Sequence, residues 1–265
     1  MKEGITPEAF AAIEDLLGEA RKGRPARELA RIEEALAIAA GARPIPADRH
    51  PLQAPRFYVP GLRARPWHDG STLEAVAQLE ASATRIAEEL DALLATRGGF
   101  QPHRLDGDLV NREELWNAFY FKLEEQTFPA NRAACPETAK VLSSLPRLGD
   151  MAFFSALSPG AHLRAHCGPT NLRLGIHLGL VVPDGCRFRV GEEVRAWERG
   201  TCLVFDDSFE HEVWNEGRGT RIVLLVDMWH PDLTDFEIEF LLQARDLIGS
   251  PAAAPASTAA APLLA

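Results

Sequence analysis

Two histidines in the second half of the chain lie in short motifs that make them candidate metal ligands. The first motif runs from His166 to Asn171 and the second from Phe205 to His211. Neutral imidazole binds transition metals, and two such ligands leave most of the coordination sphere open. Non-haem iron oxygenases usually add a carboxylate two residues after the first histidine, but that position here is Gly168. From spacing alone, a metal site and a pair of structural histidines both remain open.

The segment between the two motifs alternates strictly in polarity. Over residues 172–182, Arg173, Gly175, His177 and Gly179 fall on one face, and leucine and isoleucine side chains fall on the other. A period of two predicts a strand whose apolar face is buried. Arginine and histidine are costly to bury without partners. Such a strand suits the wall of a small barrel with a ligand inside.

The rest of the chain supplies the elements that must position these residues. Helical spacing predicts a hairpin of two helices within residues 6–40, begun by a Thr6 cap, and further helices over 71–97, 136–145 and 236–247. A Ser71–Glu74 capping box is expected to begin the helix over 71–97. Strands are predicted at 116–123, 151–157, 162–166, 172–182, 187–190, 201–205, 210–214 and 221–228. Many short strands with glycine turns indicate an antiparallel sandwich or barrel.

Three regions are expected from composition and pattern. Residues 1–48 contain the helical hairpin, 49–249 the β-rich domain, and 250–265 a tail of only Ala, Pro, Ser, Thr and Leu that predicts disorder. Residues 43–70 are rich in proline and arginine and are expected to lie across the domain surface. The hairpin either packs on the main domain or forms a contact in a homodimer.

Charge and hydropathy limit the partners and the compartment. The 265 residues carry a formal net charge of −10, which argues against nucleic acid as a partner. No signal peptide is evident, and no run approaches the ~20 apolar residues of a membrane span. We therefore expect a cytoplasmic protein that does not act at a membrane, with its four cysteines reduced.

Motifs between residues 155 and 233 resemble those of the aspartyl/asparaginyl β-hydroxylase family of 2-oxoglutarate-dependent oxygenases. They are Ser158–Gly160, His166–Asn171, His177–Leu180, Phe205–Glu212 and Asp227–Pro231, with Phe57–Leu62 and Pro66–Asp69 upstream. The resemblance spans roughly residues 52 to 235. It implies a double-stranded β-helix, a jelly-roll relative of the cupins, and therefore a mainly β fold with flanking helices.

The resemblance also implies roles for individual residues. His166 and His211 would bind Fe(II), in a family that has only two histidine ligands and a glycine where the carboxylate would be. Ser155 and Arg221 match positions that hold the distal carboxylate of 2-oxoglutarate, and His177 matches one that contacts this cosubstrate near the metal. O2 would be the second cosubstrate. Asp206 and Asp207 are interpreted as turn-forming residues that position His211.

The substrate side of the resemblance leaves alternatives open. Arg173 matches a position near the substrate's carboxylate, although a structural salt bridge is the other interpretation. Gly175 stands where well-known members carry a second arginine, so one cationic contact is missing. The implied reaction is hydroxylation of the β-carbon of Asp or Asn, in a peptide or in a free or carrier-bound amino acid. The alternatives are hydroxylation of a lipid A acyl chain and a non-catalytic metal-binding cupin.

Overall fold

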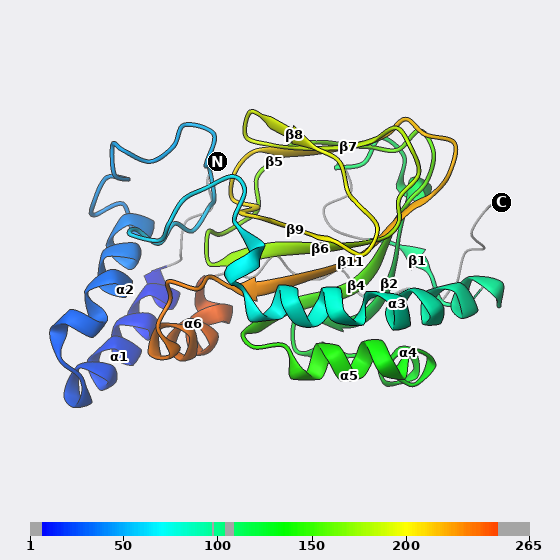
Figure 1. The fold of residues 1–265 in the computed structure, drawn as a ribbon. Coiled ribbons are helices and arrows are strands. Elements are labelled where there is room, and N and C mark those ends of the chain that lie inside the picture. The colour runs from blue at the N-terminus through cyan, green and yellow to red at the C-terminus, as the bar shows by residue number, and fades with distance from the viewer. Residues whose placement is uncertain (1–6, 97, 104–108, 249–265) are drawn as a thin grey trace.

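Two antiparallel β-sheets face each other at the centre of the computed structural model, which describes residues 7–96, 98–103 and 109–248 (Figure 1). The larger sheet has the order β1-β2-β4-β11-β6-β9, and β3 pairs with β2. Its strands are β1 (Gln101–Pro102), β2 (Trp116–Leu123), β3 (Gln126–Thr127), β4 (Leu148–Leu157), β6 (Arg173–Val181), β9 (Cys202–Phe205) and β11 (Arg221–Trp229). The smaller sheet has the order β5-β10-β7-β8. Its strands are β5 (His162–His166), β7 (Cys186–Val190), β8 (Glu193–Arg195) and β10 (His211–Asn215).

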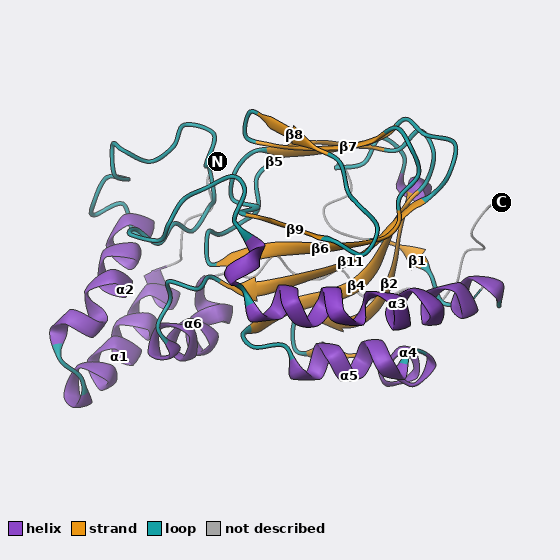
Figure 2. Cartoon of the chain, viewed as in Figure 1, coloured by secondary structure: helices purple, strands orange, loops and turns teal. Residues whose placement is uncertain are grey.

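This pair of facing sheets is a double-stranded β-helix of the jelly-roll type, and helices flank it (Figure 2). The predicted fold class is confirmed, and each predicted strand has a counterpart. The sequence pattern missed β1, β3 and β8, which have only two or three residues each and therefore too little length to show a period.

The helices α3 (Glu74–Ala95), α4 (Pro129–Ala134) and α5 (Pro136–Ser144) lie outside the larger sheet. The apolar face of β6 packs in one core with α3, through Leu174, Ile176 and Leu178 against Leu79 and Ile86. The alternation predicted for this strand is therefore confirmed. Its other face points between the sheets, where His177 and Phe188 share a stacked contact.

The predicted capping box at Ser71 is wrong. Ser71 lies in a short 3-10 helix, η1 (Gly70–Thr72), which Asp69 caps by accepting the Ser71 N–H at 2.9 Å. Helix α3 begins after it at Glu74, with no side-chain cap. Asp69 fits this position because aspartate readily accepts from a backbone N–H two residues on. A second 3-10 turn, η2 (Glu113–Leu115), precedes β2.

The predicted helical hairpin forms at one end of the barrel. Helices α1 (Pro7–Gly23) and α2 (Ala26–Ala39) lie beside α6 (Asp235–Ile248), and the three share one apolar cluster that includes Phe57 and Trp229. The hairpin thus packs on the main domain, and the homodimer contact stays a prediction. The predicted tail over 250–265 and the Thr6 cap lie outside the described residues. Among the residues described, no helix has the length and apolarity needed to cross a membrane.

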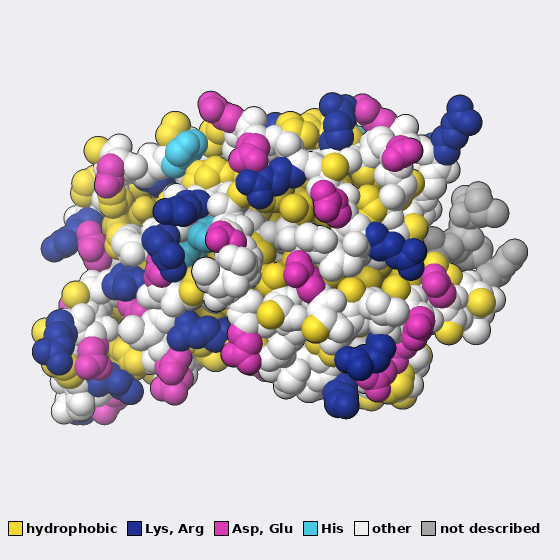
Figure 3. All heavy atoms as spheres, in the orientation of Figure 1, with side chains coloured by type: hydrophobic (Ala, Val, Ile, Leu, Met, Phe, Trp, Pro, Cys, Tyr) yellow, Lys and Arg dark blue, Asp and Glu magenta, His cyan; other side chains and the backbone are white. Residues whose placement is uncertain are grey.

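The proline- and arginine-rich segment crosses both histidine motifs. The Ala54 N–H donates to the carbonyl of Ser208 at 3.0 Å, and the Arg56 N–H donates to the carbonyl of Pro169 at 2.9 Å. The Asn171 side chain adds two 2.8 Å hydrogen bonds to the backbone of Val59. The segment therefore fixes the two motifs relative to each other. On the face shown in Figure 3, basic and acidic side chains are interspersed.

Candidate active site

The two predicted metal ligands lie side by side on paired strands of the smaller sheet. His166 on β5 is the register partner of His211 on β10, and their ring centroids are 4.1 Å apart. The Nδ1 of His166 is 2.7 Å from the carbonyl oxygen of Arg164, and that of His211 is 2.9 Å from the carbonyl oxygen of Phe209. A carbonyl can only accept, so each Nδ1 carries the proton and donates it. The Nε2 of both rings is left as an acceptor suited to a metal.

Burial keeps both imidazoles in the neutral form that binds metals. It lowers the pKa of His211 to about 3, with a further contribution from the charge of His166, and it lowers the pKa of His166 as well. In the described part of the chain, no group of three or more histidine, cysteine or acidic side chains is placed to hold an ion. The two neutral imidazole nitrogens are thus the candidate donors here, and their role as metal ligands stays a prediction.

The third-ligand position at Gly168 faces a carboxylate from the other motif. The Gly168 N–H donates to the Asp207 carbonyl at 2.6 Å, and a β-carbon at Gly168 would lie 2.5 Å from the Asp207 carboxyl carbon. Asp206 accepts from the Ser208 N–H at 2.9 Å and from the Gln53 amide at 3.3 Å, so it holds the turn before His211. The space that a carboxylate two residues after His166 would use is already taken.

Arg221 is a buried cation without an acidic partner. Its side chain is 2% exposed, and its guanidinium carbon lies 4.6 Å from the centroid of the Trp197 ring. Among the described residues, its one protein hydrogen bond is at 3.5 Å to the Ser155 carbonyl, and its Nε has no partner. Burial lowers its pKa to about 10, which still leaves it charged at pH 7. An uncompensated buried charge is costly, so this group is suited to an anionic ligand.

Two tryptophans orient further hydrogen-bond donors near Arg221. The Trp116 indole donates to the Ser155 hydroxyl oxygen at 3.0 Å, which leaves the hydroxyl proton free to donate. The Trp197 indole lies 3.3 Å from Nδ1 of His177. An indole N–H can only donate, so the proton of His177 is on Nε2, which is buried without a partner. Ser155, His177 and Arg221, predicted to bind one cosubstrate, each present an available donor.

Arg173 has very different surroundings. Its terminal nitrogens lie 2.5 Å from Asp150 and 3.4 Å from Asp227, and its guanidinium lies 4.7 Å from the centroid of Trp229. Arg245 reaches the other oxygen of Asp150 at 3.0 Å. The structure thus places Arg173 in an ion-pair cluster, which is the salt-bridge alternative. Its role toward a substrate stays a prediction.

The space beside Gly175 is occupied by an aromatic ring. A β-carbon at Gly175 would lie 2.5 Å from the ring of Phe205, so no larger side chain fits unless that ring moves. The Phe205 ring also lies 4.8 Å from His177 and 5.9 Å from His211, between centroids. The aromatic ring of Phe205 therefore lies between His177 and His211. The resemblance led us to expect an arginine side chain here, from position 175.

Four side chains that contact the candidate site residues were not identified from the sequence. They are Trp116, Asp150, Trp197 and Phe205. Trp116 and Phe205 lie at the ends of two predicted strands, β2 and β9. Trp197 lies between β8 and β9 where no period exists, so no local pattern indicates its contact with Arg221.

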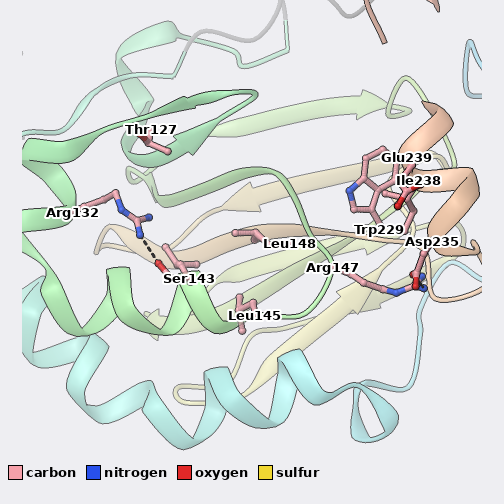
Figure 4. A pocket seen from close by; sticks show the side chains of 11 residues that line it. Thr127, Arg132, Ser143, Leu145, Arg147, Leu148, Trp229, Asp235, Ile238 and Glu239 are labelled. Carbon is pink, nitrogen blue, oxygen red and sulfur yellow. Dashed lines mark hydrogen bonds and ion pairs between the residues drawn. The ribbon is translucent and has the colours of Figure 1, made fainter. Parts of the chain in front are cut away.

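A separate groove lies between the α4–α5 region and α6 (Figure 4). Arg132, Ser143, Arg147, Trp229 and Asp235 line part of it, with Arg147 paired to Asp235 at 2.7 Å. Neither His166 nor His211 lines it. Arg132 donates to the Ser143 hydroxyl at 2.6 Å.

The fold is a cupin-like jelly roll whose smaller sheet carries two adjacent histidines, His166 and His211, and whose larger sheet carries a buried arginine, Arg221, without an acidic partner among the described residues. Residues 80–231 match the family model described as "Aspartyl/Asparaginyl beta-hydroxylase". The chain belongs to this family, which confirms the resemblance and supports an oxygenase of the hydroxylase type.

The chain is similar to several curated relatives. It is 38% identical over 191 residues to human "Aspartyl/asparaginyl beta-hydroxylase", covering 67% of this chain and 24% of the relative. It is 42% identical over 144 residues to human "Aspartate beta-hydroxylase domain-containing protein 2", covering 51% and 38%. It is 36% identical over 172 residues to "Ornithine lipid ester-linked acyl 2-hydroxylase" of Rhizobium tropici, covering 63% and 61%. The chain therefore spans less than two thirds of the length of each of these relatives.

Solved structures show weaker similarity. A prolyl hydroxylase from Trichoplax adhaerens aligns with a TM-score of 0.43 at 12% identity, covering 64% of this chain and 83% of that one. An oxidoreductase of the 2OG-Fe(II) oxygenase family from Burkholderia pseudomallei aligns at 0.39 and 13%, covering 58% and 90%.

Proposed function

We propose that this protein is an Fe(II)- and 2-oxoglutarate-dependent hydroxylase. The observation that carries the proposal is Arg221, a buried guanidinium with no acidic partner in the described structure. A permanent cation is retained in a dry site when a ligand compensates it. The combination of this anion-binding position with a histidine pair and with membership of a hydroxylase family supports an anionic cosubstrate used beside a metal.

The metal would be held by Nε2 of His166 and Nε2 of His211. Both nitrogens are unprotonated because the opposite nitrogen of each ring donates to a backbone carbonyl. Imidazole suits Fe(II), and two protein ligands leave positions for other ligands. When bound, Fe(II) supplies the activation of O2 needed to insert oxygen into a C–H bond. The chain's own contribution is to fix the two rings and to exclude water with Phe188 and Phe205.

The cosubstrate would be anchored by its distal carboxylate. Arg221 can donate two parallel hydrogen bonds to a carboxylate, and the Ser155 hydroxyl can add a third. His177 presents an Nε2–H on the same inner face and is suited to a second acceptor on the same molecule. In the overall reaction, one oxygen atom would enter the product hydroxyl and the other would enter succinate, with loss of CO2.

The substrate proposed from the family is the β-carbon of an Asp or Asn residue in a peptide, or of a free or carrier-bound amino acid. A second candidate is favoured by one comparison, since the Rhizobium tropici relative is named as hydroxylating an ester-linked acyl chain. Both reactions hydroxylate a methylene next to a carbonyl carbon. The chemistry at the reacting carbon is therefore similar in the two candidates.

The test is iron-dependent consumption of 2-oxoglutarate. Purified protein is loaded with Fe(II) anaerobically, and succinate formation is measured with and without a library of peptides and acyl esters. Product mass should rise by one oxygen atom. His211→Ala should abolish succinate formation, and Trp214→Phe on the same strand is the matched control. Failure of the loaded protein to bind or consume 2-oxoglutarate under any condition would refute the proposal.

A further inference from the structure

The groove between the α4–α5 region and α6 is a second concave site, separate from the candidate active site. Its volume is about 600 Å³, within the range of pockets that hold small molecules. Its lining comes from β3, α4, α5, β4, β11 and α6, so several elements converge on one hollow. The residues predicted to bind a metal or 2-oxoglutarate lie elsewhere. The groove therefore has no part in the proposed hydroxylation.

Two arginines line the groove, and they differ in their partners. Arg147 donates to the carboxylate of Asp235 at 2.7 Å. Arg132, which is half-buried, donates through one terminal nitrogen to the Ser143 hydroxyl at 2.6 Å and to the Ala139 carbonyl at 3.2 Å. Both of these partners are neutral. Among the residues that the structure describes, Arg132 has no acidic partner, and its Nε and other terminal nitrogen accept no further bond partner. Its charge is thus available to an anion.

The orientation of Arg132 is fixed by the helix beside it. The Ser143 hydroxyl accepts from Arg132 and donates to the Ala139 carbonyl at 2.8 Å. Both residues belong to α5, whereas Arg132 belongs to α4. A guanidinium held in this way loses less side-chain entropy when a ligand binds to it.

The remainder of the groove is largely apolar. Five of its lining side chains are apolar: Leu142, Leu145, Leu148, Trp229 and Ile238. Leu145 and Leu148 lie between Arg132 and the α6 side of the groove (Figure 4). Leu148 and Ile238 are only partly buried, so they present apolar surface to the groove. Covering this surface with an apolar group is favourable.

The charges in the lining favour a ligand with a single negative charge. The pair of Arg147 with Asp235 is neutral as a unit, which leaves Arg132 at one end and the exposed Glu239 at the α6 end (Figure 4). One carboxylate matches one guanidinium through charge-assisted hydrogen bonds. A phosphate monoester carries about −1.5 to −2 and exceeds the one available cation. A second acidic group at the far end would face Glu239.

We propose that this groove binds a monocarboxylate with an apolar body, of the size of a medium-chain alkyl carboxylate. The carboxylate would accept from the available N–H groups of Arg132, and the apolar body would lie on Leu145 and Leu148. This site is independent of the proposed function, because it shares no residue with the candidate active site. Its occupancy therefore does not require iron or 2-oxoglutarate.

The test is calorimetric binding of octanoate to the full chain. Octan-1-ol, which lacks the charge, and acetate, which lacks the apolar body, are the matched probes. Octanoate should bind at least about tenfold more tightly than either probe, because only octanoate can use both the guanidinium and the apolar surface. Absence of octanoate binding, or equal affinities for octanoate and octan-1-ol, would overturn the proposal.

Two variants locate the binding within the groove. Arg132→Gln should weaken octanoate binding by at least about tenfold, and Arg85→Gln, at an exposed arginine paired with Glu137, is the matched control that should leave it unchanged. Thr127→Trp fills the groove from an exposed position on β3 without changing its charge, and it should also weaken binding. Native affinity in folded Arg132→Gln or in Thr127→Trp would overturn the proposal.

A third variant separates this site from the candidate active site, where Arg221 also attracts carboxylates. Arg221→Met should leave the octanoate affinity within twofold of the native value. Loss of octanoate binding in Arg221→Met, with binding kept in Arg132→Gln, would place the ligand beside Arg221 and overturn the groove site. Failure of the native protein to bind 2-oxoglutarate, with octanoate binding intact, would instead refute the proposed function and leave the groove site standing.

Discussion

Arg221 and Arg173 are two arginines on neighbouring strands of the same sheet, β11 and β6, with opposite electrostatic surroundings. Arg221 is 2% exposed and has no acid near it in the described structure, whereas Arg173 lies between two aspartates. Burial alone therefore does not distinguish a ligand-binding arginine from a structural one. The difference lies in whether the protein itself supplies the compensating charge.

The two arrangements have different consequences for stability. A buried ion pair that loses one partner leaves an uncompensated charge, which costs about 3–5 kcal/mol. A buried arginine that has no partner already carries this cost in the folded protein. The same substitution at the two positions should therefore change stability in opposite directions. Measuring the stability of both variants is the clearest test of this contrast.

The largest expected effect is at Arg221. Arg221→Met should weaken 2-oxoglutarate binding by roughly tenfold to several thousandfold, because each hydrogen bond to a charged group is worth about 1.5–3 kcal/mol. The same variant should unfold at an equal or higher temperature, since an apolar side chain replaces an unpaired cation. Binding is measured by calorimetry on Mn(II)-loaded protein. Arg187→Met is the control at an exposed ion pair, and unchanged affinity in Arg221→Met would remove Arg221 from the cosubstrate site.

Arg173→Met should have the reverse pattern. It leaves Asp227 without a cation and Asp150 with Arg245 alone, so the free energy of unfolding should fall by about 3 kcal/mol, the lower end of the range for a broken buried pair. The affinity for 2-oxoglutarate should stay nearly intact. Urea unfolding and calorimetry on the same preparation check both statements. If Arg173→Met is as stable as the native protein, the ion-pair cluster does not hold the sheet together.

A smaller effect is expected from Gly168→Asp, at the position where the Asp207 carboxyl lies against the backbone. The new β-carbon would lie 2.5 Å from the Asp207 carboxyl carbon, so the single variant should bind divalent metal no more tightly than the native protein. Gly168→Asp combined with Asp207→Ala removes the clash and should bind Mn(II) more tightly, because a charged ligand replaces a water. Metal titration of both variants decides this. Tight binding by the single variant would show that Asp207 moves away freely.

The fold and the adjacency of the two candidate histidines could be predicted from local pattern and motif resemblance. The alternation over 172–182 indicated which face of β6 is buried, and the two histidine motifs indicated a pair that the structure places as register partners. The surroundings of each arginine could not be predicted, because Asp150, Trp197 and Asp227 contact them from positions that are distant in sequence. The position of the Phe205 ring against Gly175 is likewise a tertiary contact without a local signal.

The smallest effect distinguishes a residue that binds the cosubstrate from one that orients its neighbour. Trp197→Phe keeps a ring against Arg221 and Phe188 but removes the N–H that lies 3.3 Å from Nδ1 of His177. His177 should then populate both neutral tautomers, and the KM for 2-oxoglutarate should rise about fivefold, since a net hydrogen bond is worth about 1 kcal/mol. Nitrogen NMR of the imidazole reports the tautomer directly, and Trp214→Phe, at the ring that stacks on His162, is the control. A merely structural role for Trp197 would change the melting temperature and leave the tautomer of His177 as it is. A single Nε2–H tautomer together with an unchanged KM would show that the indole does not orient His177 toward the cosubstrate.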